Sequence, residues 1–373
     1  MLKICVIFGG VSAEHEVSLR SAVNVISNLD RSRYEVTMLG ITKAGAWRHY
    51  CGPVDLIAGG QWEHSHLSRP AVFSLERGRP GLILIDGEKP CASVAIRRRL
   101  LGEEPPRRTK QEFIPLDVVF PVLHGKNGED GTVQGLLELA GIPYVGSGVL
   151  SSAACMDKEV THIILQNAGV PKTKIITIRA DDLKRFGTTA TMLKTELGYP
   201  MFVKPASGGS SVGISKVQKR QELRAAIEAA LLHDEKVLVE QVVEGAEVEC
   251  AVLGNSKASA ARVLGEIAPS RDFYDYTGKY LDDSTALHIP ARISKESAKQ
   301  VKELAVKAYL ALGCKGMARV DFFVRPDGSP ILNEVNTIPG FTEISMYPRL
   351  FIKSGVTYSK LLDKLIELAL EST

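Results

Sequence analysis

The chain lacks the features that mark membrane proteins, disulfide-rich secreted proteins and nucleic-acid binders. No uninterrupted apolar stretch approaches the roughly 18 residues of a membrane span. The six cysteines are widely spread without a C-x-x-C pair, which argues against a zinc site or a disulfide framework. The formal net charge of +3 is too small to indicate nucleic acid or an anionic membrane as a partner.

Signals for export and for two common nucleotide-binding folds are also missing. The apolar run after Met1 is too short, and its flank too polar, for a signal peptide, so we expect a cytoplasmic protein. The dinucleotide pattern G-x-G-x-x-G is absent, because the run Gly146–Ser151 fails at its last position, and this argues against a Rossmann dehydrogenase. The Walker A pattern G-x-x-x-x-G-K-[ST] is absent as well.

Length and composition predict a globular protein of several units. A chain of 373 residues exceeds one typical core, and 45% hydrophobic with 24% charged residues is an ordinary globular composition. The opening pattern predicts a parallel α/β domain. Its elements are a strand at Lys3–Phe8, a helix with a buried face of Leu19, Val23 and Ile26, and a strand at Tyr34–Ile41.

Later segments alternate between strand and helix patterns. Residues 45–112 are interpreted as an irregular elaboration with some strand content, such as Gly81–Ile85. Further strands are predicted at 117–123, 174–178, 201–204, 212–217 and 236–240, and helices at 153–167, 221–232, 297–312 and 358–371. We expect an N-terminal Rossmann-like domain over 1–147, a central unit over 148–240 and a C-terminal unit over 241–373.

The segment from residue 319 to residue 340 carries the strongest chemical signal. Its turn at Pro326–Gly328 predicts a hairpin in which Asp321 faces Glu334 and Arg319 faces Asn336. Like charges directly opposite each other destabilise a strand pair. The two carboxylates and the amide therefore favour a hard cation held by oxygen ligands, most simply Mg²⁺. A solvated sheet face with scattered polar residues is the alternative.

A second signal follows the predicted strand 201–204. Lys204 ends this strand and precedes a loop of glycine and serine residues (Ala206–Ser211), whose amides could approach phosphate oxygens closely. A plain hairpin turn explains the loop alone equally well, and the lysine favours a nucleotide. The strand that ends at Glu240 and Gln241 could offer backbone groups to a purine, although this motif is weak when taken singly.

These motifs together resemble the D-alanine–D-alanine ligase family of the ATP-grasp superfamily. The resemblance covers nearly the whole chain, and the further matching runs are Gly9-Gly-Val-Ser-Ala-Glu14, His124-Gly-Lys-Asn-Gly-Glu-Asp-Gly131, Gly146-Ser-Gly148, Met156-Asp-Lys158 and Phe273-Tyr-Asp-Tyr-Thr-Gly-Lys279-Tyr280. It implies an α/β fold of the ATP-grasp type with an N-terminal Rossmann-like domain. It also implies that ATP phosphorylates the carboxylate of one D-alanine and that the amine of a second attacks the acyl phosphate, for peptidoglycan precursor synthesis.

The resemblance assigns a role to each matching residue. The implied catalytic residues are Glu14, Ser210, Tyr280, Arg319 and Gly340. The implied substrate-binding residues are His124, Lys279, Ser345 and Met346. The implied ATP-binding residues are Lys158, Lys204, Gly209, Ser210, Ser211, Glu240, Gln241, Val243, Glu247 and Lys279. The implied ligands of two Mg²⁺ or Mn²⁺ ions are Asp321, Glu334 and Asn336. A homodimer is expected, with room for a monovalent cation, and no nucleic-acid or membrane partner is expected.

Alternatives remain open at several points. Glu14 could simply interact with a helix dipole, and His124 could be a structural histidine. Met346 stands where many family members have leucine, and a D-alanine–D-lactate or D-alanine–D-serine ligase would use the same machinery. The presence of Tyr280 favours the dipeptide product over the depsipeptide, whereas an extra hydroxyl on the second substrate is hard to exclude. A non-catalytic ATP-binding module would show gaps among these residues, and we find none.

Overall fold

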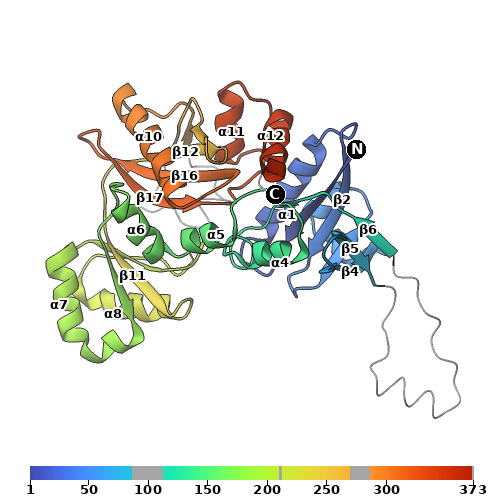
Figure 1. The fold of residues 1–373 in the computed structure, drawn as a ribbon. Helices are drawn as coiled ribbons and strands as arrows, with labels where there is room; N and C mark the ends of the chain where they lie inside the picture. The colour runs from blue at the N-terminus through green and yellow to red at the C-terminus, as the bar shows by residue number, and fades with distance from the viewer. Residues whose placement is uncertain (86–111, 210–211, 269–285, 372–373) are drawn as a thin grey trace, which may run out of the picture.

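The computed structural model describes residues 1–85, 112–209, 212–268 and 286–371, which form three β-sheets with covering helices (Figure 1). The first sheet has the order β6-β5-β4-β3-β2-β1-β7. Its strands are β1 (Leu2–Gly9), β2 (Tyr34–Ile41), β3 (Trp47–Tyr50), β4 (Ser68–Phe73), β5 (Gly81–Leu84), β6 (Glu112–Pro115) and β7 (Val118–Pro121). Its helices are α1 (His15–Asn28), α2 (Asp55–Ala58), the 3₁₀ turn η1 (Gln61–His64) and α4 (Thr132–Ala140).

The parallel part of this sheet lies at one end of the strand order, in β2, β1 and β7. β1 pairs with β2 and with β7 in parallel, and its buried residues run continuously from Ile4 to Phe8, as expected for a strand covered on both faces. The strands β3 to β6 extend the sheet in antiparallel fashion. The strand predicted at Gly81–Ile85 within the 45–112 segment is confirmed as β5, and the described part of this segment is more regular than expected, because β3 and β4 also join the sheet.

The second sheet is antiparallel, with the order β10-β9-β11-β8. Its elements are β8 (Ile175–Arg179), the 3₁₀ turn η2 (Ala180–Arg185), α7 (Phe186–Leu197), β9 (Met201–Pro205), β10 (Ser215–Val217), α8 (Arg220–Leu231) and β11 (Lys236–Gln241). The strand predicted at 212–217 is shorter than expected. α8 buries Leu223, Ala226, Ile227 and Ala230, whose spacing of three or four residues places them on one helix face.

The third sheet has the order β15-β14-β12-β16-β17, with β13 paired to β12. Its strands are β12 (Ala246–Leu253), β13 (Ser259–Ala260), β14 (Gly265–Ala268), β15 (Ala286–His288), β16 (Met317–Val324) and β17 (Pro330–Asn336). The helices α10 (Lys295–Ala311), α11 (Met346–Lys353) and α12 (Tyr358–Glu371) pack around it. Among the helices that the structure describes, none is long and apolar enough to cross a bilayer.

The single helix predicted at 153–167 is instead two helices. α5 (Val149–Met156) and α6 (Lys158–Asn167) meet at Asp157, which has an extended backbone conformation. The Asp157 carboxylate accepts hydrogen bonds from the amides of Glu159 and Val160 at 3.0 and 3.2 Å, so it caps α6. The break brings Lys158 to the start of α6, where its amide donates to the carbonyl of Ala206 at 3.0 Å.

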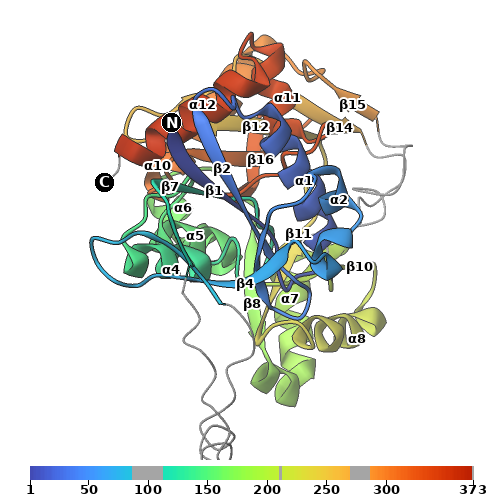
Figure 2. The ribbon, with the colours of Figure 1, turned by 90° about the vertical axis from the view of Figure 1, so that its right-hand side faces the viewer.

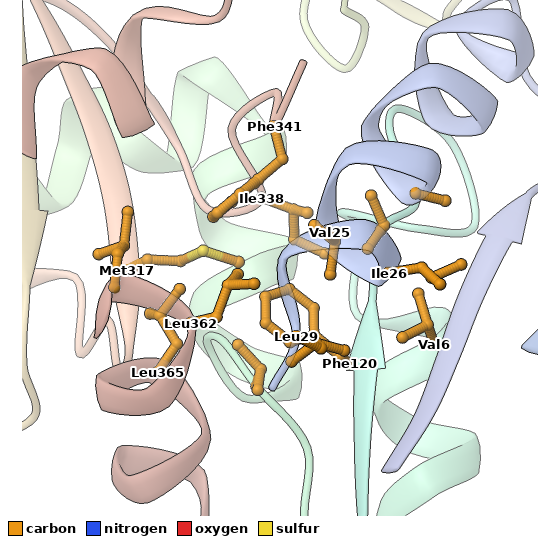
Figure 3. Packing of buried hydrophobic residues seen from close by; sticks show 14 of the residues in the cluster. Val6, Val25, Ile26, Leu29, Phe120, Met317, Ile338, Phe341, Leu362 and Leu365 are labelled. Atoms are coloured by element: carbon orange, nitrogen blue, oxygen red, sulfur yellow. The ribbon is translucent and has the colours of Figure 1, made fainter. Parts of the chain in front are cut away.

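One apolar core joins the first and third sheets. Val25, Ile26 and Leu29 of α1 lie in the same buried cluster as Leu362 and Leu365 of α12 (Figure 3). α12 accordingly lies beside α1 in two views of the molecule (Figures 1 and 2). This shared core holds the ends of β1 and β7 in a fixed relation to the loop that follows β17.

Candidate active site

The strands β16 and β17 form the predicted hairpin. Asp321 lies opposite Glu334 and Arg319 lies opposite Asn336, so the pairing expected at the site is confirmed. Side chains two residues apart on a strand share a face, and these four side chains consequently project from one face of the sheet.

The same hairpin differs from expectation near its turn. Val324 pairs with Pro330, so the loop covers residues 325–329 rather than 326–329. The amide of Arg325 donates to the carbonyl of Ser329 at 3.0 Å and closes the loop. A bulge at Asn333 then adds one residue to β17. The two differences cancel, which is why the site residues face each other as predicted.

Arg319 is the centre of a charged network on this face. Its Nε lies 2.9 Å from Oδ1 of Asp321 and its Nη2 lies 2.7 Å from Oδ2, and Asn336 donates to the same carboxylate at 3.1 Å. Glu249 on the neighbouring strand β12 approaches Nε of Arg319 to 3.2 Å. Burial would lower the pKa of Arg319, but the charges of Asp321 and Glu249 outweigh it and hold the pKa well above its usual value.

The metal-binding expectation can be tested against the donors that are present. Asp321 and Glu334 supply carboxylate oxygens and Asn336 supplies an amide oxygen, all from one face of the sheet. Such oxygen donors suit Mg²⁺, whose remaining coordination positions would be filled by water or phosphate. Within the described part of the chain, no group of three His, Cys, Asp or Glu side chains is arranged to hold a metal. This set of two carboxylates and one amide is not a group of that kind, and its oxygen donors fit a metal whose remaining positions are taken by substrate oxygens.

A cavity of about 170 Å³ lies in front of this face. It is lined by residues from the N-terminal sheet, the loop after β9 and the third sheet. Ten predicted site residues line it: Glu14, His124, Lys158, Gly209, Arg319, Glu334, Asn336, Gly340, Ser345 and Met346. Three lining residues that the sequence analysis did not select are Glu129, Cys155 and Glu249. For Glu249 a weak signal existed, because it lies two residues after Glu247, which the sequence analysis selected, and both belong to β12.

Glu14 enters the cavity at the start of α1. Its side chain makes no helix-capping hydrogen bond, while its position at the N-terminus of α1 remains compatible with an interaction with the helix dipole. A Cβ atom on Gly125 would lie 2.8 Å from its Oε2, and one on Gly209 would lie 2.7 Å away. Both positions therefore need glycine if the carboxylate is to sit between the two loops.

Glu129 lies on the same side of the cavity. Its Oε2 accepts from the amide of Gly125 at 2.7 Å. Burial, together with the nearby Glu14, raises the pKa of the Glu129 carboxyl to about 8, against the opposing effect of the Gly125 amide. The Glu129 carboxyl therefore holds its proton more readily than an exposed one.

The predicted phosphate-binding lysines occupy different environments. Lys158 donates from Nζ to the carbonyl of Gly208 at 2.7 Å and so contacts the glycine-rich loop directly. Lys204 forms a buried ion pair with Glu240. Burial would raise the pKa of Glu240, but Lys204 outweighs it and the pKa is lowered. His162 lies close by on α6, and burial lowers its pKa to about 4, so this ring is neutral.

The remaining predicted nucleotide residues do not line the cavity. Gln241 is exposed at the end of β11, whereas Val243 and Glu247 are half-buried around the following bend. Four predicted residues lie outside the described part of the chain: Ser210, Ser211, Lys279 and Tyr280.

Ser345 and Met346 close the far end of the cavity. Ser345 precedes α11, and its hydroxyl accepts from the amide of Thr342 at 3.0 Å. Met346 is buried and packs over Gly265, where an added Cβ would lie 2.3 Å from its sulfur. This end of the cavity therefore combines a hydroxyl with an apolar wall.

Comparisons with known proteins identify the family of the chain. Residues 3–147 match the model of the D-ala D-ala ligase N-terminus, and residues 164–367 match that of the C-terminus. The D-alanine–D-alanine ligase of Thermoanaerobacter sp. (strain X514) is 48% identical over 99% of this chain and 97% of its own length.

Two solved structures have the same fold over nearly the full length. The VanG D-Ala:D-Ser ligase from Enterococcus faecalis is 43% identical, covers 99% of both chains and has a TM-score of 0.84. The D-alanine-D-alanine ligase from Coxiella burnetii is 34% identical, covers 100% of this chain and 96% of its own, and has a TM-score of 0.81. The predicted ATP-grasp fold and family are thereby confirmed: the chain belongs to the D-alanine–D-alanine ligase family.

Proposed function

We propose that the chain joins two D-alanines at the expense of ATP and that the cavity in front of β16 and β17 is its active site. The observation that carries the proposal is the convergence of Glu14, Arg319, Glu334 and Gly340 on one cavity. A carboxylate for an ammonium group, a cation for an acyl phosphate and an oxygen-rich face for a metal are the groups that this reaction needs.

The first half-reaction is the transfer of the γ-phosphoryl group of ATP to the carboxylate of the first D-alanine. Glu14 pairs with the ammonium group of that substrate and turns its carboxylate towards the nucleotide. Lys158 and Lys204 offset the phosphate charge. Asp321, Glu334 and Asn336 would hold Mg²⁺ or Mn²⁺, which when bound neutralises charge on the transferring phosphoryl group.

In the second half-reaction the amine of the second D-alanine attacks the acyl carbon. A C–N bond forms, the bond from carbon to the phosphate oxygen breaks, phosphate leaves with the electron pair, and the amine loses a proton. Arg319 and the amide of Gly340 stabilise the charge that develops on the carbonyl oxygen. Ser345 binds the carboxylate of the second substrate, and Met346 packs against its methyl group.

The other assignments complete the nucleotide site. Gly209 with Ser210 and Ser211 covers the phosphates. Four residues along β11 and the bend after it bind the adenosine: Glu240, Gln241, Val243 and Glu247. Lys279 joins the phosphates, and Tyr280 with Ser210 and Glu14 closes the site, because an acyl phosphate hydrolyses when water enters. A monovalent cation near the phosphates is compatible with this arrangement.

The choice of second substrate is the sharpest open point. The 43% identity to a D-Ala:D-Ser ligase favours D-serine as the alternative acceptor. The wall formed by Met346 rejects one added hydroxyl weakly, by on the order of 100-fold at most. The relative that is 48% identical is named a D-alanine–D-alanine ligase, and this favours D-alanine as the second substrate. We therefore assign D-alanine to the second position.

The test is phosphate release from ATP and Mg²⁺ with D-alanine, D-serine, D-lactate and L-alanine, alone and in pairs, with products identified by mass. Release with D-alanine alone, matched by D-alanyl-D-alanine, supports the proposal. Product only with added D-serine or D-lactate would assign the chain to the corresponding variant ligase. No turnover with any pair, despite bound ATP, would indicate a non-catalytic ATP-binding module.

The same proposal includes the cellular setting and the assembly. We propose that the protein acts in the cytoplasm, because the reaction needs ATP and serves peptidoglycan precursor synthesis. We also propose that it forms a homodimer. We also propose that the functional units follow the boundaries 1–147, 148–240 and 241–373. Sedimentation velocity tests the dimer, and limited proteolysis tests the boundaries.

A further inference from the structure

The loop that carries Gly340 is held by side chains from the N-terminal sheet. The amide of Phe341 donates to the hydroxyl of Ser21 at 3.2 Å. Nδ1 of His124 lies 3.1 Å from the carbonyl oxygen of Ile338. Ser21 belongs to α1 and His124 follows β7, and both side chains are buried. Side chains from α1 and from the loop after β7 thus hydrogen-bond to the loop that follows β17.

The chemistry of the partners fixes the proton on His124. A carbonyl oxygen can only accept, so Nδ1 must carry the hydrogen that points to Ile338. Nε2 is then an acceptor, and it lies 3.3 Å from the hydroxyl oxygen of Ser21. The hydroxyl donates to Nε2 and accepts from the amide of Phe341. Burial lowers the pKa of His124, which agrees with a neutral ring.

We propose that Ser21 and His124 are positioning residues that aim the amide of Gly340 at the reacting carbonyl. The chain of hydrogen bonds fixes both ends of the segment 338–341, in which Gly340 is the third residue. The inference rests on the proposed function, where this amide stabilises the developing oxyanion. It also changes the role of His124, because both ring nitrogens are used within the protein and neither is left to bind D-alanine.

Apolar packing holds the loop in place independently of these bonds. The ring of Phe341 is fully buried and contacts the rings of Phe120 and Tyr347 at centroid distances of 5.9 and 5.6 Å. The hydroxyl of Tyr358 and the side-chain amide of Asn24 also donate to the carbonyl of Phe341, at 2.7 and 2.8 Å. Removing the hydroxyl of Ser21 should therefore change the aim of the loop rather than unfold it.

The first test is Ser21→Ala. A displacement of about 1 Å at a reacting group can cost about 100-fold, so we expect kcat for D-alanyl-D-alanine formation to fall by about 10- to 100-fold. The KM for ATP should change by less than about threefold, because the nucleotide contacts lie elsewhere. Ser21→Thr keeps the hydroxyl and should recover most of the lost kcat. An unchanged kcat in Ser21→Ala overturns the proposal.

Ser18→Ala is the matched control. Ser18 lies one turn earlier on α1, is equally buried, accepts from the amide of Gly9 at 2.8 Å and donates to the carbonyl of Val122. It has no such bond to the segment 338–341. Both alanine variants should lose similar thermal stability, but only Ser21→Ala should lose kcat. An equal loss of kcat in both would show that the effect is general destabilisation.

A readout without turnover separates this inference from the proposed function. In ¹⁵N NMR spectra of the wild-type imidazoles, His124 should be neutral with its proton on Nδ1. Hydrogen exchange at the amide of Phe341 should accelerate in Ser21→Ala and not in Ser18→Ala. A proton on Nε2, or unchanged hydrogen exchange at the amide of Phe341, overturns the proposal that Ser21 and His124 position the segment 338–341. If the wild-type chain ligates no substrate, the proposed function fails and the catalytic part of this inference fails with it, while the exchange data still decide the contact.

Discussion

The ion pair between Lys204 and Glu240 makes a strong prediction about stability. The two side chains are only 8% and 6% exposed, so neither charge is well solvated. Lys204→Met keeps the approximate length of the side chain and removes its charge. The Glu240 carboxylate would then be buried without its cation, which typically costs about 3–5 kcal/mol of the free energy of unfolding at neutral pH.

The stability lost in Lys204→Met should depend on pH, and the pKa of Glu240 determines in which direction. In the wild type the pKa of Glu240 is lowered, so the pair stabilises the fold above the pKa of the unfolded chain and this contribution is lost as the pH falls. In Lys204→Met burial becomes the dominant effect, opposed only by the smaller effects of Thr173 and His162, and it raises the pKa of Glu240 above that of the unfolded chain. The variant can then relieve the cost by binding a proton. Its deficit relative to the wild type should shrink between about pH 7 and about pH 5.

Urea denaturation at the two pH values measures this effect without nucleotide present. The double variant Lys204→Met/Glu240→Gln should regain most of the loss, because it buries no charge. Lys174→Met is the matched control, since Lys174 forms an ion pair with Glu196 at 2.7 Å in which both side chains are about half exposed. It should have little measurable effect. An equal deficit at both pH values, with no recovery in the double variant, would refute the argument.

Three further predictions concern turnover. Glu334→Gln should lower kcat by about 100-fold or more with the fold intact, measured by phosphate release and circular dichroism, and a near wild-type rate would reject the metal assignment. Tyr280→Phe should raise acceptance of D-lactate relative to D-alanine, and an unchanged acceptor preference in competition assays would count against a closing tyrosine. Glu249→Gln should weaken the ion pair that orients Arg319 and lower kcat by about tenfold, with little change in the KM for ATP. A change confined to the KM for ATP would contradict this role of Glu249.

The sequence predicts best those features that follow from local rules. The bounds of α12 agree with the predicted 358–371, because its apolar residues recur at helical spacing. The facing of Asp321 and Glu334 follows from a turn and from alternation along two strands. The break at Asp157 was missed because an aspartate between two apolar helical patterns resembles an exposed helix residue until its partners are known. The strands β3, β4 and β6 were missed because each is short, whereas β5 agrees with the strand predicted at Gly81–Ile85.

Residues that depend on tertiary contacts could not be found from the sequence. Glu249 reaches Arg319 because β12 pairs with β16. The sequence of either strand alone does not indicate that the two strands pair. Glu129 has a raised pKa because the fold buries its carboxyl and, in addition, places it near Glu14. Ser21 is an ordinary serine on an amphipathic helix until a loop more than 300 residues later reaches it.

The arrangement of the cores explains how the site combines fixed and adjustable parts. The first and third sheets share one apolar core, and the buried side chains of α5 and α6 belong to a second core with the third sheet. The second sheet has a core of its own, which contains only residues between Ile178 and Val239. Its described links to α5 and α6 include polar contacts, such as the amide of Lys158 with Ala206 and the ion pair of Lys236 with Asp157. Individual polar contacts contribute about 1 kcal/mol each, far less than separating a shared apolar core. The substrate groups on the first and third sheets are therefore held more firmly relative to each other than the nucleotide groups on the second, which suits a site that must admit ATP and then exclude water.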